Sequence, residues 1–535
     1  MMYTRKKTLF LITAITFALV LYFSTIGERF LVASDNIYEQ IKRFMEVFNL
    51  AREYYVEEID SEEVVTGAIQ GMLESLDPHS VYIEAKKLRE IDEQFDGHYY
   101  GIGIEFIIKD KVLTIISPIA GSPSEALGLR PGDMITKIEG ESAYGISEQE
   151  VFEKLRGPKG SLVKVTINRP GLDDPFDVTI IRDKIPIYSV MTSFMIKEGT
   201  GYIYLGRFAK TTSEELESAL LDLENQGMKR LLLDLRGNSG GLLNQAIEVA
   251  DKFIDGNQKI VYTRGRRPET NDDFYATKDQ LHPHFPIIVL IDKGSASASE
   301  IVAGAIQDLD RGLIVGETSF GKGLVQNQIP MKDGSALRLT TARYYTPSGR
   351  LIQRPYDDGI MEYYEQGYDD IDPNTIADST ENKPIFYTAS GRKVYGGGGI
   401  TPDIVIKSEK LSKPVATLMS KRAFFEFGSQ YATDHKSLAD DEKSFNNFEI
   451  TPEIIGEFKK SIKHLKLDIS DQDFMAASDQ IKVFIKAEIA RNLWDSKRYY
   501  KYWRIGDRQV IEALNYFPRA EEIAGISKHD GNKNR

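Results

Sequence analysis

The chain contains no cysteine among its 535 residues, and this absence excludes three kinds of chemistry together. Without thiols there is no cysteine nucleophile, no thiolate metal site and no disulfide bond. A location outside the cytoplasm stays open, because domains of ordinary size do not depend on disulfides for stability. The seven histidines do not form the HExxH spacing of zinc sites. The sequence therefore predicts neither a metal site nor any other cofactor.

Basic residues are outnumbered by acidic ones. The chain has 67 lysine and arginine residues against 80 aspartate and glutamate residues, which gives a net charge of −13. Nucleic-acid-binding proteins present a basic surface, and no basic stripe with interleaved aromatic residues occurs in this sequence. We therefore expect no nucleic acid among the partners. The length allows several globular domains, each with its own core.

One long stretch has no charged residue, the run from Thr8 to Ile26 that follows a basic start at residues 5–7. As a helix this run would span about 28 Å, close to the thickness of the hydrocarbon core of a bilayer. No clear small-x-small cleavage site follows it. We interpret residues 1–27 as a basic start and an uncleaved transmembrane anchor, with secretion after signal cleavage as the alternative. The basic start predicts that the rest of the chain lies outside the cytoplasm, on the periplasmic or cell-envelope side.

The stretch from Pro286 to Gln326 carries the strongest signal. The apolar run 286–291 predicts a strand buried on both faces, followed by a turn and a helix that begins with the serine cluster 295–299. One serine at a helix start is typical of a cap, but three that alternate with alanine exceed what capping needs. A second predicted strand, 312–316, precedes the glycine-flanked Lys322. In a βαβ unit, the serines and the lysine would then meet where open α/β sheets place their sites.

Lys322 is the candidate base for a serine nucleophile at this place. To accept a proton near neutral pH, its amine needs a pKa lowered from about 10.4 to roughly 7–8, which burial can provide. We therefore expect Lys322 in an apolar site that is shielded from water. At the period of two that a strand imposes, Gln326 shares a face with Lys322. Its amide could hold the stem of the lysine in position.

Three motifs of this chain resemble those of the carboxyl-terminal processing peptidases, also called tail-specific proteases. They are LDLRGNSGG at 233–241, SASASEI at 295–301 and FGKGLVQ at 320–326. The resemblance extends over about residues 65 to 407. It implies a serine endopeptidase that recognises the C-terminus of its substrate, built on a crotonase/ClpP-like core.

Roles for individual residues follow from the same resemblance. It implies that Ser297 is the nucleophile, Lys322 the general base and Gln326 the residue that orients the base. The turn after the predicted strand 230–235 can supply backbone N–H groups to an oxyanion hole. Its candidate donors are Gly240 or Gly241, together with Ala298, and one such donor is worth about 3 kcal/mol.

Residues 97–184 show three signals of a PDZ domain in the expected order, a glycine pair at 101–104, a turn and strand at 128–135, and a groove helix at 147–155. A glycine pair lets backbone N–H groups converge on the carboxylate of a peptide C-terminus while the peptide adds to the sheet edge. We therefore expect substrates with free, apolar C-termini. The residues assigned to this binding site are Gly101, Ile102, Gly103, Ile104, Val151 and Leu155, and the four apolar ones are expected to line the groove.

These features together predict a multidomain α/β protein. Its parts are an N-terminal transmembrane helix, a helical region at 28–96, an inserted, mostly β PDZ domain, a peptidase core at 185–407 with a sheet built from βαβ units, and a helical domain at 408–535. An acidic insertion near 356–382 interrupts the core. Aromatic residues at 494–503 are expected to pack inside the C-terminal domain. A homo-oligomer or an adaptor stays possible as a further partner.

Three alternatives have support in the sequence. Residues 237–241 match the GxSxG turn of an α/β-hydrolase, with Ser239 as nucleophile. That chemistry needs a histidine downstream, but His282 and His284 precede a strand and would lie at its far end. Residues 316–322 match a phosphate-binding loop, yet position 323 is glycine where Ser or Thr belongs. The third is a membrane-tethered PDZ scaffold on an inactive protease core, which would not require both a serine and a buried lysine.

Overall fold

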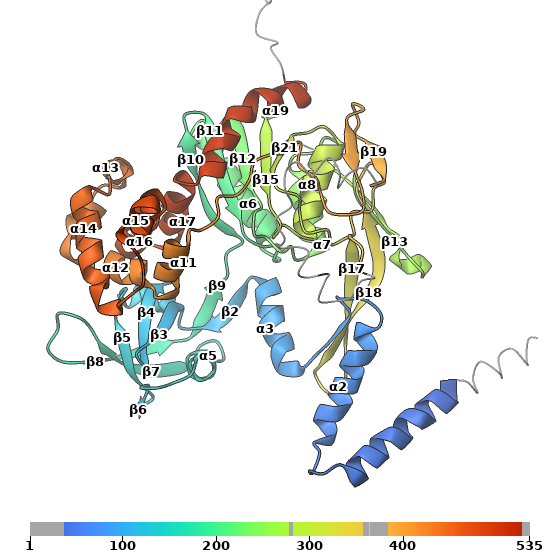
Figure 1. Cartoon of the computed structure of the whole chain (residues 1–535), viewed down its shortest axis with the longest axis horizontal. Helices are drawn as coiled ribbons and strands as arrows, with labels where there is room; N and C mark the ends of the chain where they lie inside the picture. The colour runs from blue at the N-terminus through green and yellow to red at the C-terminus, as the bar shows by residue number, and fades with distance from the viewer. Residues whose placement is uncertain (1–36, 278–281, 357–362, 364–382, 527–535) are drawn as a thin grey trace, which may run out of the picture. The chain divides into compact units, whose positions relative to one another are not determined.

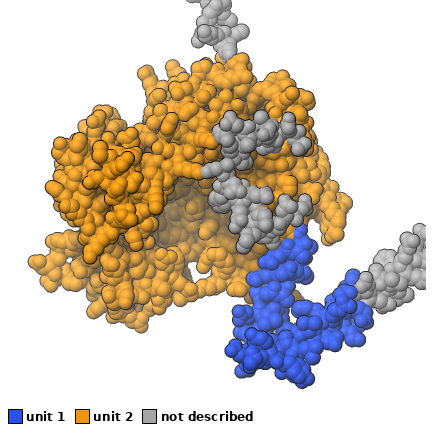
Figure 2. All heavy atoms as spheres, in the orientation of Figure 1, with its two compact units in different colours: residues 1–76 blue, residues 77–535 orange. Residues whose placement is uncertain are grey.

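The computed structural model describes residues 37–277, 282–356, 363 and 383–526. The chain divides into two compact units, residues 1–76 and 77–535, which Figure 2 shows in different colours. The predicted anchor at 1–27 and nearly all of the predicted acidic insertion lie outside the described residues. Among the helices that are described, none is both long and apolar enough to cross a membrane.

The first unit contains two described helices. Residues 37–54 are helical, and α2 spans Ser61–Glu74. The Asp60 side chain caps α2 by accepting hydrogen bonds from the N–H groups of Glu62 and Glu63, which are otherwise unpaired in the first helical turn. The helical periodicity of this part of the sequence is thus realised.

The core of the second unit is a six-stranded sheet with the order β10-β11-β12-β15-β16-β21 (Figure 1). The strands from β11 onward run parallel, and β10 pairs antiparallel with β11. Their bounds are β10 (Val190–Lys197), β11 (Thr200–Leu205), β12 (Arg230–Asp234), β15 (Ile287–Ile291), β16 (Leu313–Gly316) and β21 (Ile404–Val405).

Helices cover both faces of this sheet. On one face lie α6 (Thr212–Asn225), α7 (Leu243–Asp251) and α8 (Ala298–Asp308), and on the other α18 (Arg508–Ala513) and α19 (Phe517–Ile523). Side chains of β15 alternate between the two cores: Ile287 and Val289 face the first group of helices, and Ile288 and Leu290 face the second. The prediction of a strand buried on both faces is confirmed.

A second, five-stranded sheet stands beside the core. It has the order β1-β18-β13-β14, with β17 paired to β18. The strands are β1 (Val81–Ile83), β13 (Lys259–Gly265), β14 (Asp273–Tyr275), β17 (Leu324–Pro330) and β18 (Ala336–Tyr345). A register shift between Val325 and Gln326 interrupts the pairing of β17 with β18. A small hairpin of β19 (Ile385–Tyr387) and β20 (Lys393–Tyr395) follows.

The PDZ domain forms its own sheet, in the order β3-β4-β5-β7-β8 with β6 beside β5. Its elements are β3 (Ile104–Lys109), β4 (Val112–Pro118), α4 (Pro123–Ala126), β5 (Met134–Ile138), β6 (Glu141–Ser142), α5 (Glu148–Leu155), β7 (Leu162–Asn168) and β8 (Phe176–Ile181). The chain enters it after α3 (Ala85–Asp96). It enters through β2 (His98–Gly101) and leaves through β9 (Asp183–Pro186), and these two strands pair with each other.

The C-terminal region contributes to two cores. Its helices are α11 (Lys413–Ser420), α12 (Ala423–Asp434), α13 (Glu442–Asn446), α14 (Pro452–Ser461), α15 (Asp471–Ala476), α16 (Ser478–Leu493) and α17 (Ser496–Ile505). These seven enclose an aromatic core that includes Phe424, Phe458 and Tyr502, and the predicted packing of the aromatic residues at 494–503 is confirmed. The last two helices, α18 and α19, pack instead against the six-stranded sheet.

Candidate active site

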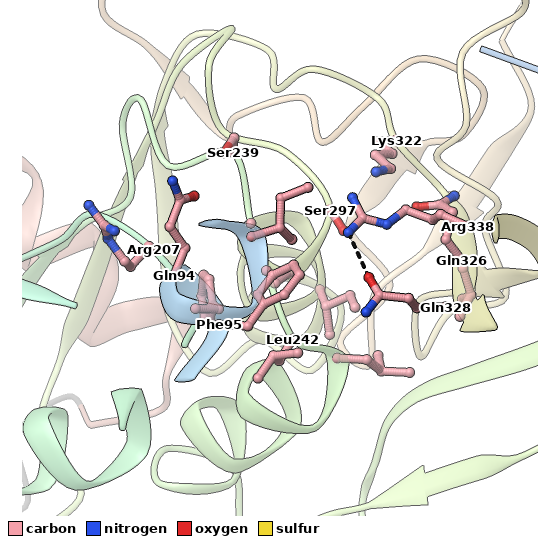
Figure 3. A pocket seen from close by; sticks show the side chains of 18 of the residues that line it. Gln94, Phe95, Arg207, Ser239, Leu242, Ser297, Lys322, Gln326, Gln328 and Arg338 are labelled. Atoms are coloured by element: carbon pink, nitrogen blue, oxygen red, sulfur yellow. Dashed lines mark hydrogen bonds between the residues drawn. The ribbon is translucent and has the colours of Figure 1, made fainter. Parts of the chain in front are cut away.

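A cavity of about 980 Å³ lies where the segments that follow β12, β15 and β16 come together. Its lining includes every residue that the sequence assigned to catalysis, namely Gly240, Gly241, Ser297, Ala298, Lys322 and Gln326. Figure 3 shows Ser297, Lys322 and Gln326 on different segments of this cavity. The βαβ arrangement therefore brings together residues that are far apart in the sequence, as expected for this kind of sheet.

The three serines at the start of α8 have different environments. The hydroxyl of Ser295 donates to the carbonyl of Leu235, and that of Ser299 donates to the carbonyl of Asn238, each at 2.8 Å. Both side chains are buried, and they fasten the helix start to the turn after β12. Ser297 alone of the three lines the cavity.

The backbone of Ser297 is strained. Its φ is +54° and its ψ is −112°, a combination that L-residues rarely adopt. Such strain costs about 1–3 kcal/mol and persists only where the surrounding structure enforces it. Here the Tyr344 hydroxyl donates to the Ser297 carbonyl at 3.1 Å, and the Ser297 N–H donates to Glu300 at 2.8 Å. No sequence pattern predicts this strain, which presents the serine at the tip of a sharp turn.

Lys322 has the environment that a lysine base requires. Burial, aided by the charge of Arg338, lowers the pKa of Lys322 to about 8, although the nearby carboxylates of Glu300 and Asp77 oppose the shift. An amine with this pKa is partly neutral near pH 7, whereas an ordinary lysine is almost wholly protonated. The side chain of Lys322 lines the same cavity as Ser297.

Glu300 is a site residue that the sequence reasoning missed. Its carboxylate is fully buried and accepts four hydrogen bonds: from the N–H groups of Ser297, Gly321 and Lys322 at 2.7–2.9 Å, and from the Ser319 hydroxyl at 2.6 Å. One carboxylate thus fixes both the turn of the serine and the loop of the lysine. The three-residue spacing from Ser297 to Glu300, typical of a capping box, was the available signal.

The same contacts bear on the phosphate-loop alternative. The N–H groups of Gly321 and Lys322, which would have to face a phosphate, donate to Glu300 instead. Burial raises the pKa of the Glu300 carboxyl to about 7, against the effect of its four hydrogen bonds. A carboxyl group from the chain itself therefore already occupies this loop.

We expect Glu300→Gln to lower kcat/KM at least tenfold. A glutamine has only one acceptor oxygen, so its amide NH₂ would face N–H groups that need an acceptor, and each buried donor left unpaired costs about 1–3 kcal/mol. Initial rates on an unstructured peptide, with melting temperatures, would test this. The matched control is Glu214→Gln on α6, where the carboxylate is exposed. An unimpaired Glu300→Gln enzyme would show that the carboxylate does not organise the site.

The two candidate oxyanion-hole glycines play different parts. The N–H of Gly240 donates to Asn238 Oδ1 at 2.9 Å and is therefore engaged within the turn. Across the residues described, the N–H groups of Gly241 and Ala298 have no hydrogen-bond acceptor. A Cβ at position 240 would come within 2.8 Å of the Ser297 Cβ, so glycine is needed there for close approach. The geometry thus favours Gly241 and Ala298 as the donors, with Gly240 as their support.

The turn after β12 is anchored from below by a buried charge network. Arg236 Nη2 contacts Asp234 Oδ2 at 2.6 Å, and Arg236 Nη1 donates to Gln509 Oε1 at 2.6 Å and pairs with Asp507 at 3.0 Å. Burial acts to raise the pKa of Asp234, but the charges of Arg236 and Arg504 outweigh it and hold that pKa at about 2. The C-terminal region therefore supplies partners to the base of the candidate oxyanion loop.

Gln326 lies in the cavity, but its contacts differ from those expected. The strand begins only at Leu324 and shifts register before Gln326, so the simple alternation counted from Lys322 does not hold. The Gln326 amide donates to the Thr340 hydroxyl at 3.3 Å, and that hydroxyl donates to Asp77 at 3.1 Å. Within the described residues, no hydrogen bond joins Gln326 to the Lys322 ammonium.

The PDZ side chains assigned to the groove are buried. Ile102, Ile104, Val151 and Leu155 are only 1–7% exposed and pack in the PDZ core, so they do not line an open groove. Nearby, the rings of Phe106 on β3 and Phe152 on α5 meet edge to face with centroids 5.4 Å apart.

The backbone of the glycine loop does match the expectation for a carboxylate site. Gly103 has a φ of +78°, and the N–H groups of Ile102 and Gly103 have no acceptor in the part of the chain that the structure describes. Gly101 ends β2 and precedes this loop. Two backbone donors are thus available to an incoming anion.

The α/β-hydrolase alternative lacks its histidine. Ser239 lines the cavity, but none of the described residues around it is a histidine. The ring of His282 contacts Glu224 at 2.8 Å and Glu217 at 3.2 Å, both on α6, and it precedes β15. It therefore lies at the end of the strand opposite the cavity, as the sequence predicted.

An α/β core whose cavity holds a serine and a half-buried lysine, together with a PDZ domain, defines a serine-type peptidase. Family models match the chain in four places: peptidase family S41 at 199–362, a PDZ domain at 114–169, the activating protease CtpB N-terminal domain at 27–87, and a family of unknown function at 415–495. The last match covers most of the helices that form the aromatic core.

Comparisons with individual proteins agree. The carboxy-terminal-processing protease of Bartonella bacilliformis is 43% identical over 323 residues, which cover 60% of this chain and 74% of that protein. The carboxy-terminal processing protease CtpB of Bacillus subtilis is 38% identical over 310 residues, 57% of this chain and 64% of that protein. The solved photosystem II D1 C-terminal processing protease is 28% identical, with 67% and 86% coverage and a TM-score of 0.35. The chain belongs to peptidase family S41, among the C-terminal processing proteases.

Proposed function

We propose that the chain is an endopeptidase in which Ser297 attacks the substrate, Lys322 acts as general base and the PDZ domain selects free C-termini. One observation carries the proposal: a single cavity holds a serine with positive φ and a half-buried lysine whose pKa is about 8. A serine hydroxyl needs an adjacent base to become a nucleophile, and a partly neutral amine can serve as one.

The reaction follows from these positions. Lys322 Nζ accepts the proton of Ser297 Oγ as that oxygen bonds to the carbon of the scissile carbonyl. The N–H groups of Gly241 and Ala298 stabilise the resulting oxyanion. When the C–N bond breaks, the lysine returns the proton to the leaving amine and an ester to Ser297 remains. Water then attacks the ester with Lys322 again as base, which frees the serine.

The N-terminal sequence supports a further part of the proposal. We place the catalytic unit outside the cytoplasm, held at the membrane by the uncharged run 8–26, because a basic start precedes that run. The crotonase/ClpP-like character of the core stays a prediction alongside this location.

The selection of C-termini can be measured with three versions of one unstructured peptide, ending in a free apolar residue, in its amide, or in aspartate. A hydrogen bond to a charged group is worth about 1.5–3 kcal/mol, so the amide should be cleaved roughly tenfold less efficiently. The aspartate version should also be slower, because its charge would be buried without a partner. The scissile bond is the same in all three. Equal kcat/KM values would contradict selection by the PDZ domain.

A further inference from the structure

Arg338, on β18, lines the catalytic cavity, yet the reaction described above gives it no part. Its Nη2 donates to Gln328 Oε1 at 3.1 Å (Figure 3), and Gln328 Nε2 donates to Asp92 of α3 at 3.2 Å. Gln328 and Arg338 are also direct cross-strand partners. The guanidinium is therefore held in place by two strands and a helix.

The charge of Arg338 is not neutralised by an ion pair. In the described portion of the chain no carboxylate lies within salt-bridge distance of it, and its hydrogen-bond partner is a neutral amide. Burial lowers the pKa of Arg338, with the charge of Asp92 opposing, but a guanidinium stays protonated at any physiological pH. The charge of a cation that is partly withdrawn from water is screened less than that of a cation in bulk water.

We propose that Arg338 is a positioning residue for proton transfer: its fixed charge, held in the same cavity as Lys322, favours the neutral amine that accepts the proton of Ser297. The proposal rests on the roles proposed above for Ser297 and Lys322. The proposal explains why a second positively charged side chain, Arg338, lies in the cavity that also holds Lys322 without an ion-pair partner among the described residues.

The other groups that face Lys322 work in both directions. Glu300, from α8, and Asp77, which precedes β1, favour the ammonium form of the lysine. His79 also lies in this field, and burial together with the charge of Lys322 lowers its pKa to about 4, so it is neutral at pH 7. Without Arg338, burial would be the main effect left to lower the pKa of Lys322, while Glu300 and Asp77 would still raise it.

The test is the dependence of kcat/KM on pH for the full chain and for Arg338→Gln and Arg338→Lys. Loss of the charge should move the midpoint of the rising limb up by about half to one pH unit, which lowers kcat/KM at pH 7 roughly three- to tenfold. The Arg338→Gln variant should recover most of its activity at pH values above its shifted midpoint. Arg338→Lys keeps a positive charge and should keep the wild-type midpoint.

A second measurement does not depend on hydrolysis. On a Ser297→Ala background, brief acetylation with acetic anhydride reports the neutral fraction of each amine, and peptide mass analysis can compare Lys322 with the exposed Lys137. Arg338→Gln should lower labelling of Lys322 about three- to tenfold and leave Lys137 unchanged, whereas Arg338→Lys should change neither.

Two outcomes would overturn the role of Arg338. One is an unshifted midpoint with a lower plateau in Arg338→Gln, which would make the residue a substrate contact or a packing element. The other is an equal shift in Arg338→Lys. If the wild-type enzyme instead showed no group that titrates near pH 8, while Lys322 labelled like an exposed lysine, the lysine base of the proposed function would itself be wrong.

Discussion

Ser297→Ala should abolish peptide hydrolysis, with a fall in kcat of roughly 10⁴- to 10⁶-fold, because the variant has no atom that can form the acyl-enzyme. The neighbouring serines provide matched controls. The hydroxyls of Ser295 and Ser299 donate to backbone carbonyls, so their alanine variants should lose more stability than activity. Single-turnover assays with mass detection of an acyl-enzyme would measure the chemical step directly. Melting temperatures would show that the variants are folded.

Ser239→Ala provides the decisive comparison. Ser239 lines the cavity but has no histidine near it among the described residues, so its removal should leave at least a tenth of the activity. Full loss in Ser239→Ala with activity retained in Ser297→Ala would replace the serine–lysine mechanism with that of an α/β-hydrolase.

Lys322→Arg should lower kcat/KM about 10²- to 10⁴-fold, the usual worth of a general base. The substitution keeps a positive charge and a long side chain but cannot present a neutral nitrogen, since guanidinium stays protonated. In the wild-type enzyme, kcat/KM should rise with pH through about 8, because burial lowers the pKa of Lys322 to that value and only the neutral form accepts a proton. Lys332→Arg, at an exposed position ten residues along the chain, is the control. A Lys322→Arg enzyme with normal activity would exclude lysine as the base.

The elements that carry strong local patterns could be predicted. The strand β15 is apolar at every position and is buried on both faces, so its pattern leaves no other arrangement. A turn and a helix follow this strand directly in the sequence, so the position of Ser297 at the start of the helix could also be predicted. The cavity follows in turn from the rule that parallel strands end at one edge of the sheet.

What the sequence could not show depends on contacts between distant segments. Glu300 looks like an ordinary capping residue until the loop 319–322 folds over it and supplies three more donors. The choice of Gly241 over Gly240 depends on a single hydrogen bond, which the Gly240 N–H donates to the Asn238 side chain. The burial of Ile102, Ile104, Val151 and Leu155 depends on how the strands and helices of the PDZ domain pack together. No periodicity encodes such pairings.

The amphipathic pattern of α18 and α19 also does not predict which part of the protein these helices pack against. A helix with one apolar stripe must bury it, but the stripe does not say against what. The sequence placed residues 508–523 in a C-terminal domain, whereas Val510 and Phe517 pack against the peptidase sheet. An apolar stripe therefore predicts burial more securely than it predicts domain membership.

The place of α18 and α19 sets an order for the making of the enzyme. A chain is synthesised from its N-terminus, and its domains usually fold as they emerge. Ser297 and Lys322 are synthesised well before residues 508–523, so one face of the sheet beside them stays uncovered until those residues follow. The PDZ domain can fold while the chain is still attached to the ribosome, whereas the six-stranded sheet is covered on this face only after residues 508–523 have been made. A protease built in this way completes its core long after its serine and lysine have been synthesised.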